Sequence, residues 1–202
     1  LVVDFDTTVN SSPTDISGQG NHGTMVGATY SAADKAFTFD ASTDIINGNV
    51  SGHNTTSGAP YTITLWAKVT GNSSVQIAFN SSGGAGTQRA FNYTHGADFR
   101  LAFNGGRREW NIPSNFSNGK WFMMTVTHAG SRATSKCYVD GQELTIKQDS
   151  ASQDTSALPN NASFEISSDD ADTTSSAPVY ISNFKLYDVA LEASEVRKLY
   201  NL

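Results

Sequence analysis

The chain contains a single cysteine among its 202 residues, so no internal disulfide can form and the cysteines indicate no cellular compartment. Cys137 lies in an alternating apolar segment, which favours a buried, inert side chain over a nucleophilic thiol. Long apolar runs are also missing, the strongest being that at 63–69, so no segment is expected to span a bilayer. Nor does a charged start precede an apolar stretch, as in a signal peptide. These absences predict a soluble module without membrane insertion.

Basic residues are scarce. There are 13 lysines and arginines against 19 aspartates and glutamates, which gives a formal net charge of −6. A protein that binds the phosphate backbone of nucleic acid needs a clustered basic surface. Nucleic acid is therefore not an expected partner.

Catalytic signatures are missing as well. A retaining glycosidase needs two carboxylates about 5–5.5 Å apart, which alternating positions on one strand can supply. Here Glu109 and Glu143 have no acidic partner two positions away, and Glu165 is followed by Ile-Ser-Ser before Asp169. The chain also lacks a Gly-x-Ser-x-Gly elbow, a phosphate-binding glycine loop and a histidine pair at metal-ligand spacing. We expect no enzymatic activity.

Most of the sequence consists of short segments of alternating apolar residues, separated by polar turns. With 38% hydrophobic residues and 17 glycines, the chain is typical of an all-β sandwich, and we interpret residues 1–202 as one domain. Two packed antiparallel sheets are expected from strands at 36–40, 61–69, 74–79, 88–94, 98–103, 121–128, 134–140, 162–167 and 179–187. Long loops are expected at 31–34, 48–60, 80–86, 105–108 and 167–178.

The last quarter of the chain gives the clearest local signals. The strand at 134–140 runs into Asp140-Gly141, a pair that tolerates the positive φ of a tight hairpin turn. After the strand at 179–187, the segment 194–200 places its apolar residues on one stripe of a short closing helix.

This order of elements resembles the laminin-G-like branch of the concanavalin A-like lectin/glucanase superfamily, which ends in a Tyr-x-Asp-Gly strand, a further strand and a short helix. Other segments resemble the family pattern in the same order: Val-Asp-Phe-Asp at 3–6, Asp-Ile-Ser-Gly-Gln-Gly-Asn-His-Gly-Thr at 15–24, Phe-Thr-Phe-Asp at 37–40, Tyr-Thr-Ile-Thr-Leu-Trp-Ala-Lys at 61–68 and Gly-Lys-Trp-Phe-Met-Met-Thr-Val-Thr at 119–127. The resemblance covers essentially the whole chain. It implies that Trp66 and Trp121 are buried strand residues.

The resemblance implies a concanavalin A-like jelly-roll sandwich of two antiparallel sheets with a short C-terminal helix. The expected function is a non-catalytic, lectin-like carbohydrate-binding or adhesion module on a cell, secreted or virion surface. Two alternatives stay open: a structural or capsid-decorating glycoprotein domain without a sugar site, and an accessory module of a polysaccharide-degrading enzyme. The expected partners are glycans or glycoprotein surfaces, or other surface or capsid proteins.

A carbohydrate site needs aromatic faces for the apolar side of a sugar ring and planar polar groups for its hydroxyls. One stretch around a glycine-rich turn offers both, and the candidate binding residues are Tyr93, His95, Asp98, Arg107, Arg108 and Trp110. The arginines could also bind a carboxylate or sulfate on an acidic glycan. The alternative is that Trp110 packs in the core and both arginines are solvated.

Calcium is the cofactor that the resemblance implies, and clustered carboxylates and carbonyls are its preferred ligands. One candidate site is the acidic loop formed by Asp169, Asp170 and Asp172, where like charges repel unless a cation or solvent relieves them. The alternative is a solvated acidic loop.

A second candidate calcium site combines Asp4, Asp6, Asp15 and Asn21, which converge only if the opening strand pairs near the closing one, as the resemblance implies. The alternative is that Asp15 and Asn21 hold a glycine-rich turn through hydrogen bonds between side chain and backbone. Position 183 is asparagine, where many relatives have aspartate, which weakens a metal site that includes it.

Eight Asn-x-Ser/Thr triplets without proline are potential glycosylation sites, and they would place the protein in a secretory or extracellular setting if occupied. The alternative is that a chain rich in serine, threonine and asparagine makes such triplets by chance. The asparagines are Asn10, Asn49, Asn54, Asn72, Asn80, Asn92, Asn115 and Asn161.

Overall fold

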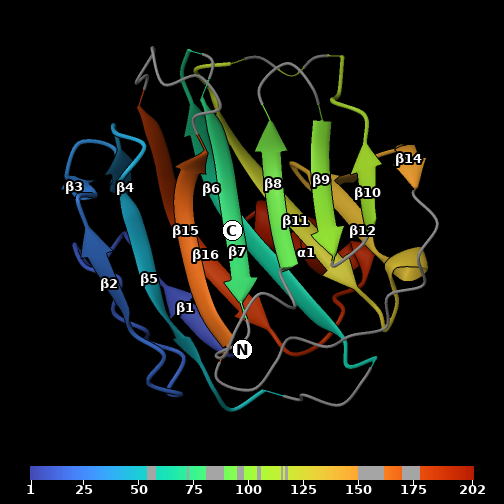
Figure 1. The fold of residues 1–202 in the computed structure, drawn as a ribbon, viewed down its shortest axis with the longest axis horizontal. Coiled ribbons are helices and arrows are strands. Elements are labelled where there is room, and N and C mark those ends of the chain that lie inside the picture. The colour runs from blue at the N-terminus through green and yellow to red at the C-terminus, as the bar shows by residue number, and fades with distance from the viewer. Residues whose placement is uncertain are drawn as a thin grey trace.

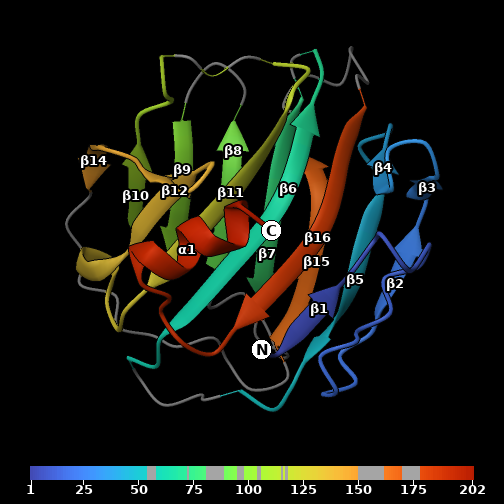
Figure 2. The same ribbon diagram turned by 180° about the vertical axis from the view of Figure 1, so that it is seen from behind.

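Two antiparallel sheets lie face to face and enclose the core (Figures 1 and 2). The computed structural model describes residues 1–53, 58–71, 73–80, 89–94, 98–103, 106–114, 116, 118–149, 162–169 and 178–202. The first sheet has the order β13 (Gln142–Glu143), β12 (Lys136–Val139), β11 (Trp121–His128), β6 (Tyr61–Val69), β16 (Val179–Tyr187), β4 (Ala36–Phe39) and β3 (Thr29–Ser31), and β1 (Val3–Phe5) also pairs with β16.

The second sheet has the order β14 (Ile146–Asp149), β10 (Gly106–Trp110), β9 (Asp98–Phe103), β8 (Arg89–Thr94), β7 (Ser74–Asn80), β15 (Ala162–Asp169), β5 (Ile45–Val50) and β2 (Gly23–Val26). A single turn of 3₁₀ helix, η1 (Arg132–Thr134), precedes β12, and α1 (Ala193–Tyr200) closes the chain. The predicted all-β jelly-roll sandwich of two antiparallel sheets with a short C-terminal helix is confirmed.

The core between the sheets follows from the strict alternation of strand side chains. In β6, Ile63 and Leu65 point inward, and in β8 Phe91 and Tyr93 do so, each at most 1% exposed. Burying an aliphatic or aromatic side chain of this size contributes about 1.5–3 kcal/mol. Because both sheets supply such residues to one hydrophobic cluster, neither sheet has a separate core.

Several segments predicted as loops lie partly in strands, most clearly at the end of β5 and the start of β10. β5 extends to Val50, and β10 begins at Gly106, although the segments 48–60 and 105–108 are rich in glycine, asparagine or arginine. Pairing explains both differences: β5 is hydrogen-bonded between β2 and β15, and β10 between β9 and β14. Tertiary context therefore overrides the low strand propensity of these residues.

The predicted Asp-Gly hairpin turn is confirmed between β12 and β13. Asp140 has a φ of 51° and Gly141 a φ of 73°, as a two-residue primed turn requires. α1 packs directly over this turn, and a Cβ atom added to Gly141 would lie 3.2 Å from the Cα atom of Arg197. Both the backbone conformation and the close approach of the helix therefore require glycine here.

α1 lies across the outer face of the first sheet, over β11 and β12 (Figure 2). Val196 is fully buried against Met123 and Tyr138, and Tyr200 stacks on Trp66 with ring centroids 5.6 Å apart. Among the described residues, no helix has the length and apolar character needed to cross a membrane. The helix thus covers part of one sheet face and leaves the rest open.

Cys137 is fully buried in β12, as predicted. Burial raises the pKa of its thiol well above the usual range, so the reactive thiolate form is suppressed.

Candidate functional site

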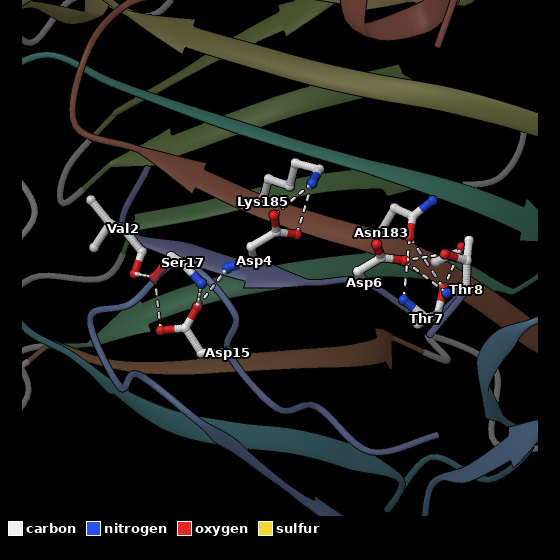
Figure 3. Close-up of polar contacts among 10 residues, drawn as sticks. Val2, Asp4, Asp6, Thr7, Thr8, Asp15, Ser17, Asn183 and Lys185 are labelled. Atoms are coloured by element: carbon white, nitrogen blue, oxygen red, sulfur yellow. Dashed lines mark hydrogen bonds and ion pairs between the residues drawn. The ribbon is translucent and has the colours of Figure 1, made fainter. Parts of the chain in front are cut away.

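The two ends of the chain meet on the first sheet. β1 pairs antiparallel with β16, with Val3 opposite Leu186 and Phe5 opposite Phe184. The expectation that the opening and closing strands lie together is confirmed. Segments more than 170 residues apart in sequence therefore share one surface, which Figure 3 shows at close range.

Asp15 holds the turn that follows β1. Its carboxylate accepts hydrogen bonds from the backbone N–H groups of Asp4 (2.9 Å), Ser17 (2.9 Å) and Asn21 (2.8 Å), and from the Ser17 hydroxyl (2.9 Å). Burial opposes the ionised form, but these hydrogen bonds outweigh it and lower the pKa of Asp15. The carboxylate is thus an internal acceptor that fixes the turn.

Asp4 is also engaged within the protein. The Lys185 ammonium lies 2.7 Å from one of its carboxylate oxygens and 2.8 Å from the other (Figure 3). Asp4 is buried, so this ion pair compensates a charge that would otherwise be costly to desolvate. The pair ties β1 to β16 across the register position that the two residues share.

These contacts overturn the second candidate calcium site. Asp6 and Asp15 do not converge, because Asp15 is directed at backbone donors while Asp6 lies beside Thr8 and Asn183. In the described ranges, no three acidic, histidine or cysteine side chains group as metal ligands. For the first candidate site, Asp170 and Asp172 lie outside the described residues, and Asp169 is placed only by its backbone at the end of β15.

A β-bulge in β16 directs Asn183 outward. The register of β16 against β6 shifts between Ser182 and Lys185, and Asn183 takes a φ of 50°. Asparagine tolerates this left-handed conformation better than most residues, and bulges commonly re-aim a side chain. The Asn183 Oδ1 atom accepts hydrogen bonds from the backbone N–H (3.3 Å) and hydroxyl (3.4 Å) of Thr7.

The orientation of the Asn183 amide follows from these contacts. Because the backbone N–H group of Thr7 can only donate, the atom facing it must be the oxygen, and the Nδ2 group points away. None of the described residues accepts a hydrogen bond from Nδ2. Asn183 therefore presents an open donor.

Asp6 supplies an acceptor beside this donor. Its Oδ1 atom accepts hydrogen bonds from the backbone N–H (2.9 Å) and the hydroxyl (2.6 Å) of Thr8, and the hydroxyl bond is the main cause that lowers the pKa of Asp6. Among the described residues, its Oδ2 atom receives no hydrogen bond. Asp6 thus stays ionised at neutral pH with one oxygen open.

Both groups line a cavity of 230 Å³ between the end of α1 and the outer face of β16 and β6. The polar residues of its lining are Asp6, Thr8, Thr64, Asn183 and Lys185, and the apolar ones are Trp66, Met123, Leu199 and Leu202. Trp66 was expected to be buried, but the residue is only half-buried: Tyr200 of α1 stacks on its ring, and another part of the side chain lines the cavity. The cavity thus combines apolar and hydrogen-bonding groups in its lining.

The predicted carbohydrate residues do not form a site, because strand alternation separates them. Trp110 and Tyr93 are each 1% exposed and face the core, so neither ring offers a face to a sugar. Arg108 is on the same side as Trp110 and is buried; it donates to the carbonyls of Ala133 (2.8 Å) and Ser135 (2.9 Å). The alternative reading of Trp110 as a core residue is correct, whereas Arg108 is not solvated.

The other predicted residues lie on the opposite, outer face of the second sheet. The exposed Arg107 pairs with Glu109 at 2.6 Å, and Arg100 pairs with Glu109 at 3.1 Å. Asp98 is bound by Lys147 at 3.2 Å and approached by Arg100 at 3.6 Å. Their charges are therefore matched internally. His95 lies outside the described residues.

The potential glycosylation sites differ in accessibility. Asn49 is exposed and Asn10 is half-buried, whereas Asn92 lies in β8 and is only 8% exposed. The folded chain does not present Asn92 for modification, so this residue is removed from the predicted set. The side chain of Asn80 is not described, and Asn54, Asn72, Asn115 and Asn161 lie outside the described residues.

The fold is a β-sandwich of two antiparallel sheets. A family model of the concanavalin A-like lectin/glucanases superfamily, in its laminin-G form, matches residues 40–197. The chain belongs to this superfamily, as the sequence resemblance predicted. No curated protein sequence matches the chain.

Several solved structures share the fold. The botulinum neurotoxin serotype D binding domain has a TM-score of 0.71 at 16% identity, covering 98% of this chain and 51% of that one. A structure of botulinum neurotoxin type C, whose cell entry depends on interaction with two ganglioside molecules, has a TM-score of 0.68 at 19% identity, covering 99% and 50%. The serotype G binding domain has a TM-score of 0.61 at 19% identity, covering 93% and 47%.

At these identities the likeness shows the fold alone. The chain spans about half the length of each of these structures. The ganglioside interaction of the type C toxin belongs to that whole chain.

Proposed function

We propose that this chain is a non-catalytic, lectin-like carbohydrate-binding module that acts in adhesion on a cell, secreted or virion surface. The observation that carries the proposal is the cavity that Asp6, Asn183 and Trp66 line together. A pyranose ring has an apolar C–H face and a rim of hydroxyls, so it suits a cavity that combines apolar and hydrogen-bonding groups. The superfamily membership and the binding-domain neighbours support the same class of function.

A binding role fits the cavity better than hydrolysis. Glycosidases use two carboxyl groups that flank the scissile bond. Among the described residues that line this cavity, only Asp6 has a carboxylate side chain, and the neighbouring Asp4 is occupied by Lys185. The cavity can therefore hold a sugar but has no acid and base pair to cleave it.

A glycan array with the purified chain tests the proposal, and two variants locate the site. Asp6→Asn should weaken glycan binding about tenfold to a hundredfold, because it removes a charged hydrogen-bond acceptor. Arg107→Ala should leave binding unchanged, because Arg107 lies on the second sheet, away from the cavity. Loss of binding in Arg107→Ala but not in Asp6→Asn would place the site elsewhere. A silent array with folded wild-type protein would refute the lectin function.

Calcium enters the proposal through the acidic loop that follows β15. A ligand that binds only the folded state raises its midpoint of thermal unfolding. Millimolar calcium should therefore raise the melting temperature by a few degrees, and a chelator should reverse the shift. Identical melting curves with calcium and with chelator would exclude a stabilising calcium site, and magnesium serves as the control for general salt effects.

A further inference from the structure

A second pocket, of 80 Å³, lies beside the turn between β12 and β13, and we call it the turn pocket. The segment between β10 and β11 lines it with Pro113, Phe116 and Lys120, β11 lines it with Trp121, and the turn lines it with Asp140. None of the described residues lines both the turn pocket and the first cavity, which carries the proposed function. The turn pocket is therefore a separate site.

Asp140 gives the turn pocket a hydrogen-bond acceptor. Its Oδ1 atom accepts a hydrogen bond from the backbone N–H group of Met123 (2.8 Å), whereas its Oδ2 atom receives none from the described residues and is not one of their fully buried atoms. Burial raises the pKa of Asp140, and among the described groups only the Met123 N–H group opposes this effect. A ligand that donates a hydrogen bond to Oδ2 would therefore stabilise a carboxylate that the protein itself stabilises poorly.

Lys120 and Trp121 supply a donor and an aromatic group. The Lys120 side chain is exposed and pairs with no carboxylate of the described residues, so its N–H groups can reach a ligand. Trp121 is half-buried, and the Lys68 ammonium lies over its ring, 5.5 Å from the centroid. Because Lys68 does not line the turn pocket, the part of Trp121 that borders the pocket is a part that Lys68 leaves uncovered.

The chemistry of this lining favours an uncharged, polar ligand. Lys120 and Asp140 carry opposite charges, so an anion would meet a like charge at Asp140 and a cation would meet one at Lys120. A purely apolar ligand would bury both charges without supplying a hydrogen bond, which is costly. The hydroxyls of a sugar can donate to Asp140 and accept from Lys120, while its C–H groups lie against Trp121 and Phe116.

The turn pocket and the first cavity both border the end of α1. Met123 lines the first cavity, and its backbone N–H group is the one that donates to Asp140. Tyr200 stacks on Trp66, which lines the first cavity, and a Cβ atom added to Gly141, the residue after Asp140, would lie 3.4 Å from the Cβ atom of Tyr200. The two sites are thus neighbours, and the last turn of α1 separates them.

Resting on the proposed lectin function, we infer that the turn pocket is a second carbohydrate subsite and that the chain binds an uncharged oligosaccharide, with one sugar unit in each pocket. Joining the two sugar units makes the second binding event intramolecular, which raises the affinity without any new contact. The chain therefore selects its ligand by length as well as by the chemistry of single sugar units.

Calorimetric titration with uncharged oligosaccharides of increasing length tests this inference. The probes are cello-, manno-, xylo- and malto-oligosaccharides of one to six units. In at least one series, the affinity should rise about tenfold or more from the monosaccharide to the hexasaccharide, because only the longer chain reaches both pockets.

The Asp140→Asn variant separates recognition from folding. Asn-Gly is also a favoured pair for a primed turn, and the amide oxygen can still accept the hydrogen bond from Met123, so the melting temperature should change by no more than a few degrees. The amide nitrogen replaces the open acceptor with a donor, which should lower the affinity for the hexasaccharide about tenfold, to near that of the monosaccharide. As a matched control, Asp40→Asn removes an exposed carboxylate outside both pockets and should leave the affinity intact.

The possible results separate this inference from the proposed function. Equal affinity at all chain lengths, or equal affinity of Asp140→Asn and Asp40→Asn for the hexasaccharide, would overturn the second subsite and leave the lectin function standing. Loss of all binding in Asp140→Asn, with none in Asp6→Asn, would show a single site at the turn pocket and would also overturn the inference. If the folded protein binds none of the four series, the inference fails, and a silent glycan array in addition would refute the proposed function itself.

Discussion

Replacing Trp110 with alanine should lower the free energy of unfolding by about 3–5 kcal/mol, the usual cost of removing a buried tryptophan from a core. Trp110 is 1% exposed and is among the largest buried side chains in the described part of the chain. Urea unfolding at 25 °C measures the change. It is followed by far-UV circular dichroism, because tryptophan fluorescence would itself be altered by the substitution. A loss below about 1 kcal/mol would contradict its place in the core.

Two further variants support this measurement. Arg107→Ala changes the same strand on its outer face, where the side chain is exposed and its ion pair with Glu109 is worth at most about 1 kcal/mol. It should therefore unfold nearly as the wild type does. If Trp110→Ala fails to fold, Trp110→Phe should give an intermediate loss, because phenylalanine leaves a smaller cavity.

Replacing Asp15 with asparagine should destabilise the protein by about 3 kcal/mol at pH 7, because an amide nitrogen would face backbone N–H groups that now donate to a carboxylate. The difference from wild type should depend on pH. Since the folded state lowers the pKa of Asp15, its contribution is complete above the ordinary carboxyl pKa of 3.8 and disappears as pH falls through the lower folded value. Once the pH is below this folded-state pKa, the two unfolding curves should approach each other.

The Ser17→Ala variant is the matched control for this effect. It removes only the Ser17 hydroxyl, which donates to Asp15 and also lies 3.0 Å from the Val2 carbonyl. We expect a loss of about 1 kcal/mol. A constant gap between wild type and Asp15→Asn from pH 7 to pH 3 would show that the ionised carboxylate does not stabilise the turn.

Local patterns predicted the fold well, because strand alternation and turn chemistry act over a few residues. The apolar alternation of β6, β9 and β16 gave their bounds correctly, and Asp140-Gly141 marked the hairpin. The prediction was wrong for β5 and β10. Their residues have little intrinsic preference for strands and are held there by neighbours on both sides.

The candidate site was harder to predict, since it depends on which face of the sandwich each side chain occupies. Treating Tyr93, Arg107 and Trp110 as one group ignored the fact that neighbouring strand positions point to opposite faces. The alternation of β10 itself could have indicated that Arg107 and Trp110 diverge. The family resemblance drew attention to Asn183 only as a position where many relatives have aspartate. Its outward direction could not be predicted, because it depends on a bulge in the pairing of β16 with β6.

The sequence by itself determined the all-β class, the superfamily, the buried cysteine and the tight turn under α1, because each of these follows from composition or from residues close together in the chain. Only the tertiary structure decided the site. Asp6, Trp66 and Asn183 are far apart in sequence and meet because β1, β16 and β6 are neighbours in one sheet and α1 leaves the end of that face uncovered. Long-range strand pairing is a property of the whole fold, so its consequences for the site appear only once the sheets are assembled.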